Sequence, residues 1–218
     1  MQLAELVAPS HTAFVISEMQ RGIVGDLAGP VLQELVTAVR ERNAVDRLRT
    51  LAEGAREHGV PVVHATIQYR RNRVGIRINT PLMAITLKDP DFMAVGSAEA
   101  EILPELGPEP GDIVHDRKHG MSAFAGTDLD MILRSLDVRT LVIGGVSLNE
   151  AIIGMAIEAV NLGYSVAVVR DASVGMPQQF AEDMLRHAFS LLGALPTVDD
   201  VLEAWAKAPA DPTSGGSR

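Results

Sequence analysis

The chain has 218 residues, of which 47% are hydrophobic and 22% are charged, and its formal net charge is -9. This composition is typical of a globular protein and excludes a disordered or fibrous one, and the length suits a single α/β domain. The negative charge, together with the lack of a basic cluster interleaved with aromatic residues, argues against nucleic acid as a partner. We therefore expect a small-molecule partner.

The sequence contains no cysteine, which removes disulfides, zinc ribbons and cysteine nucleophiles from the possible chemistry. No apolar run approaches the roughly 20 residues that a membrane span needs. The N-terminal residues have no basic residue ahead of their few apolar ones, so we expect no secretory signal there. We expect a cytoplasmic protein with no membrane partner.

Strand and helix patterns alternate through the first third of the chain. Thr12–Ser17 is a nearly continuous apolar run, which is typical of a strand buried on both faces. Residues 31–58 carry apolar side chains at helical spacing, with a break near Asn43. A second strand is expected at Val60–Ile67, and within it His64 is interpreted as a core histidine rather than a ligand.

Residues 68–96 show no clear periodicity and carry four arginines: Arg70, Arg71, Arg73 and Arg77. A loop of this length inside a compact domain is usually functional, so we expect a lid over the site or a contact between subunits. An arginine there can hold a carboxylate substrate through two hydrogen bonds. For any single arginine, a solvated basic loop is the alternative.

The second half of the chain continues the alternation. The expected elements are strands at 112–115, 140–144 and 164–170, and helices at about 127–136, 152–159, 176–192 and 198–206, the last with Trp205 as a packing anchor. Alternation of this kind predicts an α/β fold, a parallel sheet with helices on both faces. We expect one domain over residues 1–208 and a flexible tail over residues 209–218.

Three features fall on one edge of this sheet. Glu18 follows the first strand, Lys118 follows the third, and a turn from Gly145 to Ala151 follows the fourth. Ligands of parallel sheets bind at the carboxyl ends of the strands, where the first N–H groups of a helix face the crevice. A carboxylate at the end of a buried strand is costly unless it is paired or faces a cleft. Glu18 is thus either a capping or salt-bridge acid or a functional one.

Four segments carry a family resemblance: VISEMQ at 15–20, KHGMSAFAGTDLD at 118–130, GGVSLNEAI at 144–152 and GYSVAVVRDAS at 163–173. Through them the chain resembles the isochorismatase-like superfamily of hydrolases over nearly its whole length. The resemblance implies a Rossmann-like, three-layer α/β/α fold with a six-stranded parallel sheet, and a homodimer or homotetramer. It also implies a cis peptide at the turn, between Val146 and Ser147.

Members of this superfamily that cleave amides use an aspartate, a lysine and a cysteine, and the resemblance places Glu18, Lys118 and Ala151 at these positions. Without a thiolate no thioester forms, so the amidase mechanism does not carry over. Isochorismatases of the same fold hydrolyse a vinyl ether instead, which needs no nucleophilic residue. The resemblance implies that an acid there protonates the enol-ether carbon and that water captures the oxocarbenium.

We expect the substrate to be small and anionic, and to contact five residues: Val146, Ser147, Asn149, Phe124 and Arg77. No second acid or histidine near the second strand has the spacing of metal ligands, and no nucleotide-binding glycine motif occurs. We therefore expect no metal and no cofactor. Ser147 is a weak substitute nucleophile, because no histidine base is placed to activate it.

Three interpretations stay open. The first is a hydrolase in which Glu18 acts as acid or base with Lys118 as its electrostatic partner. The second is a pseudoenzyme that keeps the pocket and binds a metabolite or a protein partner. The third is a cysteine amidohydrolase that was inactivated by replacing its cysteine with Ala151.

Overall fold

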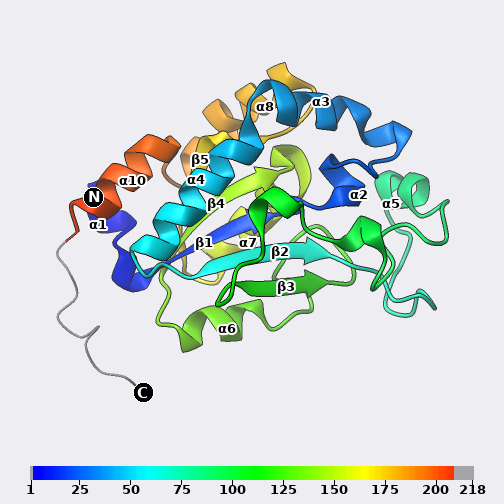
Figure 1. The fold of residues 1–218 in the computed structure, drawn as a ribbon, viewed down its shortest axis with the longest axis horizontal. Coiled ribbons are helices and arrows are strands. Elements are labelled where there is room, and N and C mark those ends of the chain that lie inside the picture. The colour runs from blue at the N-terminus through cyan, green and yellow to red at the C-terminus, as the bar shows by residue number, and fades with distance from the viewer. Residues whose placement is uncertain (1, 209–218) are drawn as a thin grey trace.

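A computed structural model describes residues 2–208, and its centre is one parallel sheet with the strand order β3-β2-β1-β4-β5 (Figure 1). The strands are β1 Thr12–Ser17, β2 Val62–Ile67, β3 Ile113–Arg117, β4 Thr140–Val146 and β5 Ser165–Val174. All four pairings are parallel, as the alternation of strands and helices predicts. β1 lies in the middle of the sheet, so both of its edges pair with neighbouring strands.

The expectation of six strands is wrong for the described residues, which form five. A short segment at residues 194–196 lies beside β5 but makes only an isolated parallel bridge, between Ala194 and Ala167. The N–H of Arg170 donates to the carbonyl oxygen of Pro196 (2.9 Å). Because Pro196 has no N–H to return a bond, the ladder cannot continue, and the sixth position is occupied by this bridge instead of a strand.

Helices cover both faces of the sheet and make three layers (Figure 1). One face is covered by α3 Gln33–Glu41, α4 Ala44–Glu57 and α10 Val198–Ala206, and the other by α6 Leu129–Ser135, α7 Ile153–Asn161 and α8 Gln178–Met184. Along β1, Phe14 and Ile16 join the first core, whereas Ala13 and Val15 join the second. This two-sided burial explains the continuous apolar run in β1.

The remaining helical elements are short. They are α1 Leu3–Leu6, η1 Pro9–His11, α2 Arg21–Val24, η2 Pro30–Leu32, α5 Pro81–Thr86, η3 Ala98–Ala100, η4 Pro104–Leu106, η5 Leu148–Ile152, η6 Leu185–Phe189 and α9 Ser190–Leu192. The expected helix break is confirmed at Asn43, which has a φ of 51° between α3 and α4. The helix expected at 176–192 is built from α8, η6 and α9 in succession.

Trp205 anchors the last helix, as its position in the sequence predicts. Its side chain is fully buried in the core between α10 and α4. Its indole N–H donates to the carbonyl oxygen of Val7 at 2.8 Å, which ties α10 to the N-terminal residues. The expected flexible tail, residues 209–218, lies outside the described residues.

The segment 68–96 contains α5 and is held by its own arginine. The Arg73 guanidinium donates to the carbonyl oxygens of Phe92 (3.2 Å), Asp89 (3.3 Å) and Pro90, and it lies over the Tyr69 ring. Arg73 therefore stabilises the segment, and it is not among the residues that line the pocket described below. In Figure 1, α5 lies beyond the arrowheads of β2 and β3, at the carboxyl edge of the sheet. None of the helices within residues 2–208 is long and apolar enough to span a membrane.

Candidate active site

A pocket of about 320 Å³ lies at the carboxyl edge of the sheet. Polar side chains enter it from the strand ends, among them Glu18 after β1, Tyr69 after β2, Arg117 at the end of β3 and Ser147 after β4. Its other walls are largely apolar and come from η2, α3 and the segment that holds α5: Val31, Leu32, Leu35, Leu82, Met83 and Phe92. The segment 68–96 therefore forms one side of the pocket; its role as a lid or as a contact between subunits stays a prediction.

Glu18 and Arg117 form the charged pair of the pocket. An Arg117 guanidinium nitrogen contacts Glu18 Oε1, and the two side chains are 6% and 12% exposed. The Glu18 backbone has a φ of 51°, and its N–H donates to the carbonyl oxygen of Ala65 at 2.9 Å. Arg117 Nε donates to the carbonyl oxygen of Gly120 at 2.9 Å. Both partners are thus fixed by backbone contacts in addition to the ion pair.

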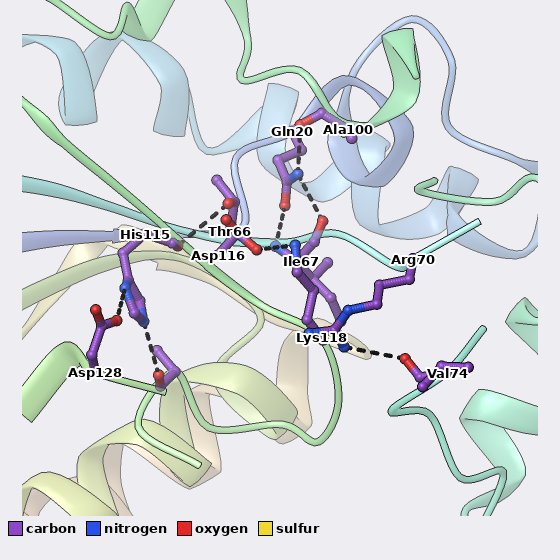
Figure 2. A network of polar contacts seen from close by, with 11 residues as sticks. Gln20, Thr66, Ile67, Arg70, Val74, Ala100, His115, Asp116, Lys118 and Asp128 are labelled. Atoms are coloured by element: carbon purple, nitrogen blue, oxygen red, sulfur yellow. Dashed lines mark hydrogen bonds and ion pairs between the residues drawn. The ribbon is translucent and has the colours of Figure 1, made fainter. Parts of the chain in front are cut away.

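Lys118 is not the partner of Glu18, which corrects the expectation from sequence. Its Nζ contacts Asp116 Oδ2 instead (Figure 2), and it is not among the residues that line the pocket. Successive side chains of a strand point to opposite sides. β3 runs to Arg117 rather than ending at His115, so Arg117 points into the pocket, and Lys118 lies on the side of Asp116.

The turn after β4 has the expected backbone. The Val146–Ser147 peptide is cis, and η5 follows directly. The N–H groups of Glu150 and Ile152 both donate to the carbonyl oxygen of Ser147, at 3.2 and 3.0 Å, whereas that of Ala151 between them does not. Ala151 lines the pocket with 3% of its surface exposed. A small side chain and the start of a helix therefore form this wall.

Three of the five expected substrate contacts line the pocket: Val146, Ser147 and Asn149. Asn149 is also structural, because its Oδ1 accepts a hydrogen bond from the N–H of Met176 at 3.2 Å. Ser17 Oγ donates to the carbonyl oxygen of Val146 at 2.7 Å, which joins β1 to the turn. The wall after β4 is thus fixed from both sides.

Phe124 and Arg77 do not line the pocket. Phe124 is buried in the core on the face of the sheet that α6 and α7 cover. Its ring stacks there on that of Tyr164, with 5.9 Å between centroids. Arg77 is exposed on the segment before α5. Phe124 therefore positions the chain after β3 through packing. Arg77, which was expected to hold a carboxylate, lies outside the pocket.

A polar clamp near the carboxyl ends of β1 and β2 is formed by Gln20, which is fully buried. Its amide nitrogen donates to the carbonyl oxygens of Ile67 (3.1 Å) and Ala100 (2.7 Å), and its Oε1 accepts from the N–H of Ile67 (2.8 Å) (Figure 2). The end of β1 is thereby tied to the end of β2. This clamp holds Glu18, two residues earlier, at a fixed place on the sheet edge.

Sequence reasoning missed four titratable residues of the pocket: Tyr69, Arg117, His119 and Glu150. Burial raises the pKa of the Tyr69 phenol to about 12; Arg117 opposes this shift, and Glu18 adds to it. Burial also raises the pKa of Glu150, and the neighbouring Glu18 charge adds to this shift while Arg117 opposes it. The alternation of buried residues along β3 is the signal that could have found Arg117.

His64 is a core residue, as expected. Its Nε2 lies 3.1 Å from Asp112 Oδ2, and both side chains are nearly inaccessible to solvent. Asp112 also accepts two hydrogen bonds from the Arg56 guanidinium, at 3.1 and 2.7 Å. This cluster lies near the amino end of β3, away from the pocket. Within the described part of the chain, no group of three or more His, Cys, Asp or Glu could hold a metal ion.

Comparisons with known proteins agree with this fold. The family model of the isochorismatase domain matches residues 12–200. The uncharacterized isochorismatase family protein YwoC of Bacillus subtilis (strain 168) is 28% identical over 198 residues, which cover 88% of this chain and 93% of that protein. Ureidoacrylate amidohydrolase RutB of Enterobacter sp. (strain 638) is 28% identical over 218 residues, covering 90% of each chain.

Two solved structures are similar in both fold and sequence. An isochorismatase family protein from Burkholderia thailandensis superposes with a TM-score of 0.73 at 26% identity, covering 91% of this chain and 96% of that one. N-carbamoylsarcosine amidase from Thermoplasma acidophilum superposes with a TM-score of 0.67 at 25% identity, covering 87% of this chain and 97% of that one. Since the family model covers most of the chain, this protein belongs to the isochorismatase family.

Proposed function

We propose that the chain is a hydrolase of small molecules that works without a cysteine nucleophile and uses the Glu18 carboxylate to activate water. The observation that carries the proposal is the Glu18–Arg117 pair, which is nearly buried and faces the pocket beside Ala151. An ion pair with Arg117 requires Glu18 in its carboxylate form, which is the form that accepts a proton. Glu18 is therefore assigned the role of base, not of acid.

The geometry suits attack by water on an unsaturated carbon. Ala151 leaves the wall of the pocket without a reactive side chain, so water is the nucleophile in this scheme. As the Glu18 carboxylate takes a proton from that water, negative charge develops on the substrate oxygen. The N–H of Ala151, in the first turn of the helix after β4 and beside the pocket, is the candidate donor to that oxygen.

The lining favours a neutral substrate with an apolar body over the anionic one that the sequence suggests. Arg77 and Lys118 lie outside the lining, and the charge of Arg117 is compensated by Glu18. The walls from α3 and α5 are aliphatic or aromatic. Two relatives are described as an amidohydrolase and an amidase, so a carbonyl–nitrogen bond is the candidate for cleavage. A vinyl ether, whose hydrolysis begins with protonation of carbon, does not fit a base at Glu18 and serves in the test as the discriminating substrate.

The test is a panel of small neutral molecules with apolar substituents: N-acyl amines, N-carbamoyl amines and vinyl ethers. Products are identified by mass spectrometry with the wild-type chain, with Glu18→Gln, and with Glu203→Gln as a matched control on the exposed side of α10. Removing a general base lowers kcat by about 100-fold or more, so Glu18→Gln should lose turnover while the control keeps it. Equal turnover in all three proteins contradicts the proposal.

A second candidate function is ligand binding without chemistry, and two observations favour it. Ala151 offers no nucleophile, and Arg117 compensates the charge of Glu18 in the resting pocket. In this case the same panel gives ligands that raise the melting temperature of the protein, but no product. Turnover that is lost in Glu18→Gln rules this second candidate out.

A further inference from the structure

Glu150 is a second carboxyl group of the pocket, and the proposed mechanism leaves it unused. It lies in η5 directly before Ala151, is half-buried, and lines the same pocket as Glu18 and Arg117. We propose that Glu150 holds the proton of the site and delivers it to the leaving group, while Glu18 remains the carboxylate base. This inference rests on the proposed function for the use of that proton.

The pocket holds two glutamates, and one of them is already paired with Arg117. The charged and titratable side chains that share the pocket with Glu150 are Glu18 after β1, Tyr69 after β2, and Arg117 and His119 at and after the end of β3. A single guanidinium compensates one carboxylate, and Arg117 is already in contact with Glu18. A second carboxylate in a pocket with apolar walls would be costly. Glu150 is therefore the member of the pair that takes up a proton.

Glu150 lies in the first turn of its helix, yet its pKa is raised, and the pocket around it accounts for this. An acid in the first turn of a helix ordinarily gains from being ionised, because the N-terminus carries partial positive charge. The pKa of Glu150 is nevertheless raised, first by burial and then by the charge of Glu18, against the opposing effect of Arg117. An ordinary helix-start glutamate on the surface would not show this shift.

The complete reaction balances with water as the only co-reactant. For an amide, the water oxygen bonds to the carbonyl carbon as Glu18 takes one of its protons. The carbon–nitrogen bond then breaks, and the proton of Glu150 goes to the leaving nitrogen, which departs as an amine. Before the next turnover, a proton passes from Glu18 to Glu150 through solvent. No electron transfer and no further group are needed.

Carboxyl ¹³C NMR of protein labelled at its glutamate side chains tests the proton directly. The Glu150 signal is identified by its loss in Glu150→Gln and followed with pH in the wild-type chain and in Glu18→Gln. We expect a titration midpoint above that of an exposed glutamate such as Glu203, and a lower midpoint in Glu18→Gln because the like charge is removed. A Glu150 midpoint equal to that of Glu203 in both proteins overturns the proposal.

Turnover of any panel substrate gives the second readout. Glu150→Gln should lower kcat by about 100-fold or more, and Glu150→Asp should recover part of it because a shorter acid still carries a proton. The high-pH fall of the rate profile should disappear in Glu150→Gln. Full activity of Glu150→Gln overturns the role of Glu150 but leaves Glu18 as base. If no panel molecule reacts, the proposed function fails, and the titration alone decides whether the coupled pair exists.

Discussion

Arg117 at the end of β3 pairs with Glu18 at the end of β1, across the intervening strand β2. This contact brings two charged side chains, 6% and 12% exposed, into the lining of one pocket. The neighbouring Lys118 pairs with Asp116, and both of these side chains are more accessible, at 28% and 34%. Two adjacent basic residues therefore have different surroundings and should differ in their effect on stability.

Substituting these two basic residues with Met separates the buried pair from the accessible one. Arg117→Met leaves the Glu18 carboxylate without a partner, which should lower the free energy of unfolding by about 3 kcal/mol. Lys118→Met should lower it by less than about 1 kcal/mol. Urea unfolding followed by circular dichroism measures both. The double variant Glu18→Gln/Arg117→Met should recover much of the loss, and equal losses in the two single variants would contradict the assignment of Arg117.

Introducing a cysteine tests whether position 151 faces the pocket. The chain has no other cysteine, so Ala151→Cys carries a single thiol, which should be alkylated by iodoacetamide in the folded protein. Ala159→Cys is the matched control, since this alanine of α7 is fully buried in the core. It should react only after unfolding. Mass spectrometry measures the labelled fraction, and similar rates for the two variants would show that Ala151 is not accessible.

The alkylation rate of Ala151→Cys also reports on Glu18. The thiolate is the reactive form of a cysteine, and Glu18 as a base would help to generate it. Alkylation at neutral pH should therefore be slower in Glu18→Gln/Ala151→Cys than in Ala151→Cys. Faster alkylation in the double variant would mean that the Glu18 charge acts mainly by repelling the thiolate, and that it does not serve as a base for this position.

Much of the fold could be predicted because hydrophobic periodicity is a local property of the chain. β1 has the predicted bounds, and Asn43 breaks the long helix where expected. The number of strands could not be predicted in this way. The segment at 194–196 runs along β5, but its pairing depends on Pro196 and on hydrogen bonds to distant residues. The expectation of six strands came from the family resemblance instead.

The position of the site was predictable, but the identity of its partners was only partly so. Glu18 and the turn to Ala151 follow strands whose ends share one edge, so topology alone brings them together. The choice between Arg117 and Lys118 depends on where β3 ends, and a shift of one residue exchanges the two sides of a strand. Element ends are the least certain part of a sequence-based prediction. Glu150 has no signal in the sequence, because its burial arises from segments far away.

The buried cluster around His64 predicts that stability falls as the pH falls. Burial lowers the pKa of His64 below its ordinary value of 6.5, and Asp112 only partly opposes this shift. Below that value the unfolded chain binds a proton at His64 that the folded chain does not, so the unfolded state is favoured. The stability contributed by a neutral His64 is thus present above pH 6.5 and is lost progressively below it.

The pKa of Asp112 lies in a lower pH range than that of His64, so the two contributions to the pH dependence of stability can be separated. Burial acts to raise its pKa, but hydrogen bonds from Arg56, from the Glu109 N–H and from His64 outweigh burial, so the pKa lies below 3.8. Its contribution is therefore lost only in stronger acid. Urea unfolding at about pH 7.5 and about pH 5 should show a smaller decrease in stability for His64→Gln than for the wild-type chain. An equal decrease would assign the pH dependence to other groups.

Gly145 of β4 lies against the backbone of Ser17 in β1, and a methyl group should not be tolerated there. Its φ is +110°, and an added Cβ would lie 2.3 Å from the carbonyl oxygen and 2.8 Å from the nitrogen of Ser17. Gly163 is the matched control, since its φ is +92° but no atom lies within 4 Å of an added Cβ. Gly163→Ala should therefore lose only the conformational term, about 1–2 kcal/mol.

Gly145→Ala adds a clash with the backbone of β1 to the same conformational term, so its loss should exceed that of Gly163→Ala by several kcal/mol or abolish folding. Soluble yield and circular dichroism reveal a failure to fold, and urea unfolding measures any variant that does fold. Because Ser17 directly precedes Glu18, a folded Gly145→Ala should also displace the acid and weaken the binding of panel ligands, whereas Gly163→Ala should bind them normally. Equal stability and equal binding in the two variants would show that the close approach of β4 to β1 does not hold the pocket in place.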